Sequence, residues 1–321
     1  MTLLKVEDLK TYFPGKSSIF SKKKSMVYAV DGVSFSLEQG KTIGIVGESG
    51  CGKTTVGMSL LNLVKPTSGK IFFKGKNITD LSKLSKKEVL NIRKEMQIIF
   101  QDPYSSLNPR ATLKTILDVP MKIHGIPSDV RQEKIEYLLE KVGLRPEHAS
   151  RYPHEFSGGQ RQRIGIARAL SLNPSLIIGD EPVSALDVSI QAQIINLLID
   201  LQDEFNLSYI IIAHDLAVVE HIADTIAVIY LGKIVEQANF SDLYRSPQHP
   251  YTQTLLSAIP IPDPHKKRDR VILKGSVPSP LNPPNGCSFH PRCPNKKKDC
   301  ETVEPVLKTI SPGHTVACHF A

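Results

Sequence analysis

The stretch "GIVGESGCGKTT" is the part of the chain that most constrains what it can fold into. It fits the pattern G-x-x-x-x-G-K-[ST] with Gly47, Gly52, Lys53 and Thr54. The apolar run before it predicts a strand, and "GKTTVGMSLLNLV" predicts the start of a helix. In that context backbone N–H groups and a helix N-terminus converge on an anion. A phosphate-binding loop is therefore a better interpretation than a chance glycine-rich turn.

Each polar residue of this loop has an expected partner on a nucleotide. Lys53 should reach the β- and γ-phosphates, and the Thr54 hydroxyl should bind Mg²⁺. The residues that we expect to contact ATP are Gly47, Ser49, Gly50, Cys51, Gly52, Lys53, Thr54 and Thr55.

Two later strands end in polar residues that would complete such a site. "SLIIGDEP" ends in Asp180, expected to hold the Mg²⁺ shell, and Glu181, expected to polarise the attacking water as general base. Both carboxylates could instead cap the next helix. "YIIIAHD" places His214 after another apolar run, where it could sense the γ-phosphate, although a lone histidine is more often structural.

A second anion-binding turn stands in "EFSGGQRQRIGIARAL". Ser157, Gly158 and Gly159 precede a helical pattern that carries Arg161, Arg163 and Arg168. The chain already has one phosphate loop, so the sequence raises the question of whose phosphate this second turn reads.

Composition sets broad limits. The 321 residues suggest about two domains. No apolar run approaches the roughly 20 residues that cross a bilayer, and no secretory signal is visible, so we expect a cytosolic location. The net charge of +8 is compatible with a solvated surface, nucleic acid, anionic lipid or nucleotide, and does not choose among them.

Short apolar strands alternate with amphipathic helices, which predicts an α/β fold with a mixed, mostly parallel sheet. "LLKVEDLK", "AVDGVSFSL" and the hairpin "SGKIFFKGKNI" predict further strands, whereas residues 83–170 have a helical pattern. Proline and charge dominate after Pro260. We therefore predict one domain over residues 1–260, with a helical subdomain at about 101–170, and a linker and C-terminal segment over 261–321.

The ordered motifs GESGCGKT, FQD, SGGQ, LIIGDEP, SALD and AHD resemble an ABC-type ATPase over residues 1 to about 260. This resemblance implies a helical signature subdomain and a head-to-tail dimer in which SGGQ reads the γ-phosphate held by another subunit. It implies catalytic roles for Glu181, His214 and Gln101. The other residues that it assigns are Gln101 beside Mg²⁺, Asp187 in the D-loop, and Ser157, Gly158, Gly159 and Gln160 in the signature.

The resemblance also implies an aromatic residue that stacks on adenine before the first long loop. Phe13 is the first choice, with Tyr12 and Tyr28 as alternatives, because a basic insertion around Lys22–Lys24 blurs the correspondence. Phe156 stands where the family usually has leucine before SGGQ, and we expect the packing to adapt.

"FQDPYSSLNPR", "SPQHPYTQTLLSAIPIPDP" and "GCSFHPRCP" resemble one branch, the ATP-binding subunits of oligopeptide and dipeptide importers. The loop after "YFPGK" resembles the F-type partner of their two ATPases. The partners implied are a second, related ATPase, two membrane permeases and an extracytoplasmic peptide-binding protein, with no nucleic acid. The protein would then be peripheral, on the cytoplasmic face of the membrane. Nickel or sugar importers share these motifs, and an ABC protein acting on nucleic acid is the rival class.

Four cysteines close the sequence: Cys287, Cys293, Cys300 and Cys318. Their spacings lack the C-x₂₋₄-C pairs typical of structural zinc, and four thiolates suit either zinc or an iron–sulfur cluster. The importer resemblance implies a [4Fe–4S] cluster that orders this segment. Zinc, and four reduced cysteines with no metal, stay open as alternatives.

Overall fold

The computed structural model describes residues 1–15, 25–259, 273 and 275–321. The basic insertion around Lys22–Lys24 and the predicted boundary near Pro260 lie outside these ranges. The described residues form two compact units. The first unit comprises Met1–Glu38, Thr42–Asp80 and Ala213–Ala321, and the second comprises Gln39–Lys41 and Leu81–Ile212.

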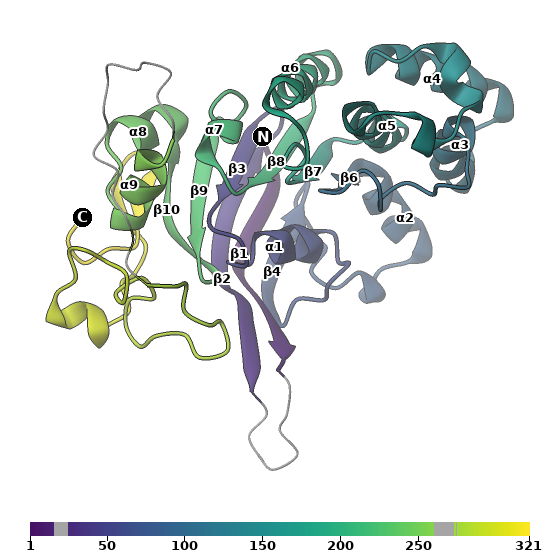
Figure 1. Cartoon of the computed structure of the whole chain (residues 1–321). Helices are drawn as coiled ribbons and strands as arrows, with labels where there is room; N and C mark the ends of the chain where they lie inside the picture. The colour runs from purple at the N-terminus through teal and green to yellow at the C-terminus, as the bar shows by residue number, and fades with distance from the viewer. Residues whose placement is uncertain (16–24, 260–272, 274) are drawn as a thin grey trace. The chain divides into compact units, whose positions relative to one another are not determined.

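An antiparallel sheet with the strand order β2-β1-β4-β5 belongs to the first unit (Figure 1). Its strands are β1 (Thr2–Pro14), β2 (Met26–Glu38), β4 (Ser68–Phe73) and β5 (Lys76–Asn77). Along β2 buried residues alternate with more exposed ones, because successive side chains of a strand point to opposite faces. The strands and the hairpin predicted from these sequences are confirmed.

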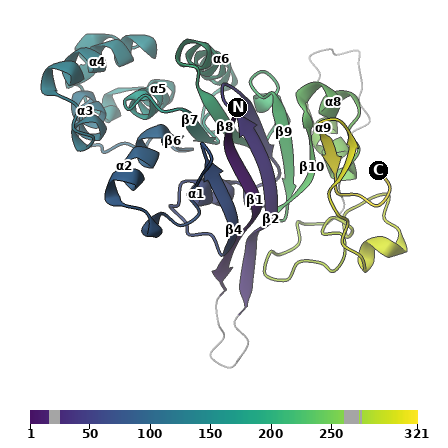
Figure 2. The same ribbon diagram turned by 180° about the vertical axis from the view of Figure 1, so that it is seen from behind.

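The other strands of the first unit surround β9 (Thr225–Tyr230), which pairs in parallel with β3 (Thr42–Val46). On its other side β9 is antiparallel to β10 (Lys233–Asn239). The C-terminal segment adds β12 (His314–Val316) against β10, followed by β11 (Lys308–Ser311). Figure 2 shows these yellow strands beside β10. The helical elements are α1 (Lys53–Leu60), α7 (Leu216–Val219), α8 (Phe240–Arg245), α9 (Pro250–Ser257) and η4 (Lys298–Glu301).

Three parallel strands form the core of the second unit: β6 (Met96–Ile99), β7 (Leu176–Asp180) and β8 (Ser208–Ala213). Every residue of β7 and β8 is buried, as expected for parallel strands covered on both faces. The helical elements are η1 (Leu81–Lys83), α2 (Lys86–Glu95), α3 (Leu113–Ile123), α4 (Ser128–Lys141), η2 (Pro146–Ser150), η3 (Pro153–Glu155), α5 (Gly158–Leu170) and α6 (Val188–Phe205).

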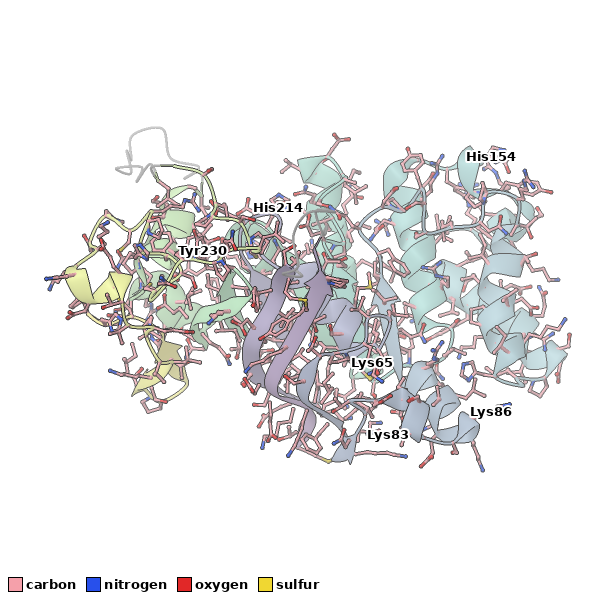
Figure 3. All side chains as sticks on the ribbon, turned by 90° about the horizontal axis from the view of Figure 1, so that it is seen from below. Lys65, Lys83, Lys86, His154, His214 and Tyr230 are labelled. Carbon is pink, nitrogen blue, oxygen red and sulfur yellow. The ribbon has the colours of Figure 1, made fainter. Side chains whose placement is uncertain are left out.

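Strand β6 differs from the helical pattern that the sequence predicts over residues 83–170. The stretch "MQII" is too short for the spacing of its apolar residues to distinguish a strand from a helix. It becomes a strand because it pairs with β7. Helix α2 just before it is confirmed; it begins at Lys86, and Lys83 ends the preceding η1 (Figure 3). In the described part of the chain, no helix has both the length and the apolar character required to cross a bilayer.

His249 is a buried histidine at the start of α9. Its Nδ1 accepts a hydrogen bond from the Tyr251 N–H at 3.1 Å, and its backbone N–H donates to the buried carboxylate of Glu236 at 2.9 Å. That carboxylate also lies 2.7 Å from Nε2 of His314, and the Phe289 ring packs against the His249 imidazole. Burial lowers the pKa of His249 to about 4.

This lowered pKa predicts a loss of stability in acid. An unfolded imidazole titrates near pH 6.5, so between about pH 6.5 and 4 the unfolded chain binds the extra proton. The free energy of unfolding should therefore fall by about 2 kcal/mol from pH 7 to pH 5 through this group. Urea unfolding at both pH values should show that His249→Asn, which can still cap α9, removes this difference. The exposed control His221→Asn should keep it; an unchanged slope in His249→Asn would contradict the assignment.

Candidate active site

The phosphate loop connects β3 to α1 in the first unit. All five residues of β3 are buried, so the strand fixes where the loop begins. Gly52 precedes α1 with φ of 102°, in the left-handed region. The Lys53 side chain is 4% exposed and folds back over the loop, donating to the carbonyl oxygens of Gly47 at 2.7 Å and Glu48 at 3.0 Å. The ammonium group is thus held where the loop's backbone curves.

Glycine is required at both ends of the loop. A Cβ atom on Gly52 would lie 1.9 Å from the carbonyl oxygen of Ala29, and one on Gly47 would lie 2.2 Å from that of Ile229. Gly232, after β9, donates its N–H to the Cys51 carbonyl at 2.9 Å and accepts from the Asp31 N–H at 2.8 Å. The loop is therefore pressed against β2 and against the end of β9.

Glu48 is bound by two residues of the C-terminal half. Its backbone N–H donates to the Tyr251 hydroxyl at 2.8 Å, and its carboxylate accepts two hydrogen bonds from Arg292, at 2.5 and 2.9 Å. Neither contact was predicted from the sequence, because "GCSFHPRCP" served there only as a family motif and as a source of cysteines. An arginine inside that motif, opposite an acidic residue inside the phosphate loop, was the available signal.

The three aromatic candidates for adenine stacking differ in their surroundings. Tyr12 donates its hydroxyl to Asp31 at 2.6 Å, and its ring meets Tyr28 edge-on at a centroid distance of 4.8 Å. Phe13, on β1, is 36% exposed. A ring that stacks on a base needs an accessible face, which favours Phe13; its role stays a prediction.

In the second unit, the predicted acidic pair lies at the carboxyl end of β7. Asp180 is 5% exposed, and Glu181 adopts φ of 46°, a conformation uncommon for a residue with a side chain. Its backbone N–H donates to the Ile212 carbonyl at 2.9 Å. The side-chain amide of Gln101 donates to Glu181 at 3.0 Å, so the structure brings these two predicted catalytic residues together.

The signature residues begin helix α5. Ser157 caps the helix: its Oγ lies 3.4 Å from the Gln160 N–H, and the Gln160 side chain accepts from the Ser157 N–H at 3.1 Å. A Cβ on Gly159 would lie 2.6 Å from the Ile190 side chain, so this position needs glycine for packing. Ser157 is exposed, while the flanking Phe156 is 4% exposed and lies under Arg151.

The three arginines of α5 bind the protein's own carbonyl groups. Arg161 donates to Pro153 at 2.7 Å and lies over the Tyr104 ring. Arg163 donates to Val142 at 2.8 Å, and Arg168 donates to Ser106 at 2.6 Å. Burial lowers the pKa of Arg168. These side chains stabilise the segments around α5. No periodicity in the sequence predicts these contacts, because the acceptors lie in other segments of the chain.

The remaining predicted residues lie at element ends. His214 directly follows β8 and is exposed (Figure 3). Asp187 is the exposed residue that precedes α6. Ser49, Gly50 and Thr54 are exposed around the phosphate loop, as an anion-binding surface requires.

Comparison with known proteins identifies the family. Residues 30–184 match the family described as "ABC transporter", and residues 235–300 match "Oligopeptide/dipeptide transporter, C-terminal region". The oligopeptide transport ATP-binding protein AppF of Bacillus subtilis is 56% identical over 99% of this chain and 97% of its own length. The dipeptide transport ATP-binding protein DppF of Haemophilus influenzae is 50% identical over 98% and 96%.

The chain belongs to the ATP-binding proteins of oligopeptide/dipeptide ABC transporters. The resemblance stated from its motifs is thereby confirmed, and the chain is an ABC ATPase. The rival classes, a nucleic-acid protein and an importer of nickel or another solute, are not favoured by these relatives.

Solved structures agree with the ABC ATPase fold. CbiO1 of Clostridium perfringens, part of the ABC transporter complex cbiONQ, superimposes with a TM-score of 0.65 at 28% identity, covering 76% of this chain and 91% of that one. The ATP-binding cassette MJ0796, in a dimeric post-hydrolysis state bound to ADP and Pi, gives 0.64 at 26% identity, covering 74% and 99%.

The predicted iron–sulfur cluster in this ABC ATPase is wrong. Within residues 1–15, 25–259, 273 and 275–321, no group of three His, Cys, Asp or Glu side chains is placed to hold a metal ion, which also speaks against zinc. Burial, together with the neighbouring Cys300, Cys293 and Cys318, raises the pKa of the Cys287 thiol to about 11. The matching relatives are named as ATP-binding proteins only.

The close approach at Gly52 predicts a loss of nucleotide binding on adding one methyl group. Gly52→Ala places a Cβ against the Ala29 carbonyl, so we expect MgATP to bind at least about tenfold more weakly, by titration calorimetry. Gly75→Ala is the matched control: its φ of 76° is also left-handed, but nothing lies within 4 Å of its Cβ position. Equal affinities in the two variants would show that the contact is irrelevant to the loop.

Proposed function

We propose that this ABC ATPase powers the import of oligopeptides or dipeptides through membrane permeases. The observation that carries the proposal is the similarity to AppF and DppF over nearly the whole chain, combined with a formed phosphate loop. The match to the oligopeptide/dipeptide C-terminal region, residues 235–300, supports this branch over other ABC transporters.

Each predicted site residue has its own role in the hydrolysis of ATP. Lys53 neutralises charge on the β- and γ-phosphates, and Thr54 and Asp180 supply the oxygen ligands that suit Mg²⁺, with Gln101 beside it. Mg²⁺ held by these residues would supply charge neutralisation at the transferred phosphoryl group. Glu181 orients and deprotonates the attacking water, and His214 contacts the γ-phosphate. The segment around Gln101 would contact the permease. The hydrogen bond between Gln101 and Glu181 supports a direct link between that segment and the general base.

The second anion-binding turn reads a nucleotide held by a different subunit. Ser157, Gly158, Gly159 and Gln160 at the start of α5 would face the γ-phosphate bound by a second, related ATPase, with Asp187 in the D-loop beside them. The dimeric state described for MJ0796 supports such an arrangement. This chain takes the F-type place in the pair, beneath two permeases and an extracytoplasmic peptide-binding protein, at the cytoplasmic face of the membrane.

Phe13 stacks on adenine, and its exposure on β1 supports this role. We retain the division into an ATPase domain of residues 1–260, with its helical subdomain at about 101–170, and a C-terminal structural or regulatory segment of residues 261–321.

Replacing Glu181 by Gln should abolish turnover without abolishing binding. The amide cannot accept the proton of water, so we expect kcat for ATP to fall at least about 100-fold, the usual contribution of a general base. MgATP affinity should stay within about twofold. Glu204→Gln, in the last turn of α6, is the matched control and should retain full activity in the assembled transporter. A Glu181→Gln variant with normal turnover would remove Glu181 from the mechanism.

Affinity purification of the tagged chain from its native membranes, solubilised gently, tests the assembly. Two permeases and a second, similar ATPase should come with it, and the associated binding protein should bind peptides. Recovery of ribosomes or DNA with no membrane partner would overturn the proposed function.

A further inference from the structure

The contact between Arg292 and Glu48 joins the C-terminal segment to the phosphate loop within the first unit. The two residues are 244 positions apart, yet both guanidinium NH groups reach the carboxylate, one on each oxygen, at 2.5 and 2.9 Å. The Arg292 side chain is 7% exposed and that of Glu48 is 28% exposed. Fork-to-fork pairs of this kind are among the strongest charge-assisted hydrogen bonds.

The Arg292 guanidinium packs on a cluster of buried aromatic rings, Tyr230, Tyr251 and Phe289. It lies 5.9 Å from the centre of the Tyr230 ring, which packs edge-on against Phe289 at 5.2 Å and Tyr251 at 4.8 Å. Phe289 is three residues before Arg292 and is 1% exposed, so it anchors this stretch of the C-terminal segment. Tyr230, the ring nearest to the guanidinium, is labelled in Figure 3.

Glu48 is constrained through each of its polar groups. Its N–H donates to Tyr251, its carbonyl accepts from the Lys53 ammonium, and its carboxylate accepts from Arg292. The residue lies next to Gly47, inside the loop whose N–H groups bind phosphate. A carboxylate without a partner in this loop would repel a polyanionic nucleotide bound by the loop, because like charges at short range repel each other.

We propose that Arg292 is a positioning residue for the phosphate loop, which neutralises the Glu48 carboxylate and thereby keeps the loop's affinity for nucleotide phosphate high. The C-terminal segment then sets nucleotide affinity through one ion pair. This role of Arg292 requires only that the chain binds ATP. It would therefore hold even if the transporter carried a solute other than peptides.

Substitutions of Arg292 and Glu48 distinguish charge neutralisation from simple structural support. If charge neutralisation is the effect, Arg292→Gln exposes the carboxylate, and removing that carboxylate as well restores binding. If Arg292 merely holds the fold, the second substitution restores nothing. Lysine keeps the charge but loses the fork, so Arg292→Lys should retain part of the affinity.

The test is titration calorimetry of the full chain with a non-hydrolysable ATP analogue and Mg²⁺. Arg292→Gln should weaken binding about tenfold, which is about 1.4 kcal/mol. The Arg292→Gln/Glu48→Gln double variant should return to within about threefold of the wild type, and Glu48→Gln completes the double-mutant cycle. The loss in Arg292→Gln should shrink as salt is raised, since ionic screening weakens charge repulsion.

Arg245→Gln, an exposed arginine of α8, is the control and should bind as the wild type does. Should Arg292→Gln fail to fold, Arg292→Lys carries the test, with an expected loss of about threefold that Glu48→Gln again reverses. The proposal is overturned if the double variant is as weak as Arg292→Gln, if the loss is independent of salt, or if Arg292→Gln binds as tightly as the wild type.

Discussion

The close approach of backbone to backbone around the phosphate loop is the constraint on which the nucleotide site of the first unit depends. Gly47 and Gly52 allow the loop to lie against the carbonyl groups of Ile229 and Ala29, at separations that leave no room for a side chain. Gly232 then joins the loop to β2 through two hydrogen bonds. The curvature that directs N–H groups toward phosphate is therefore imposed by the strands around it.

In the second unit, the positive charges next to the signature turn bind the protein's own carbonyl groups. Helix α5 starts with the exposed Ser157, but the arginines that follow, the buried Arg161 and the half-buried Arg163 and Arg168, donate to carbonyl groups of the surrounding residues. Buried guanidinium groups need such acceptors, because an unpaired charge away from water is strongly unfavourable. The positive charges that follow the signature turn thus stabilise the segments around α5 through these carbonyl contacts.

Sequence alone predicted the parts that depend on local pattern. The phosphate loop, the acidic end of β7 and the cap of α5 each lie within a few consecutive residues, so their motifs carry the information. It could not predict that β6 is a strand, because four residues hold too little periodicity. It also missed the Arg292–Glu48 pair, whose partners are remote in the chain, and it assigned a cluster to four cysteines that the structure shows as free thiols, of which Cys300 is buried and the other three are half-buried. Long-range packing decides all three.

The reciprocal hydrogen bonds between Ser157 and Gln160 have a consequence for how the signature turn selects its ligand. In the single subunit the Ser157 Oγ and the Gln160 N–H already pair with each other, so a phosphate ion that bound both groups would have to displace this contact. A nucleotide presented by a docked subunit arrives at a far higher effective concentration. In the proposed dimer, the turn would therefore bind free phosphate weakly and would bind a nucleotide that a second subunit delivers in place, so its occupancy would report assembly of the two subunits.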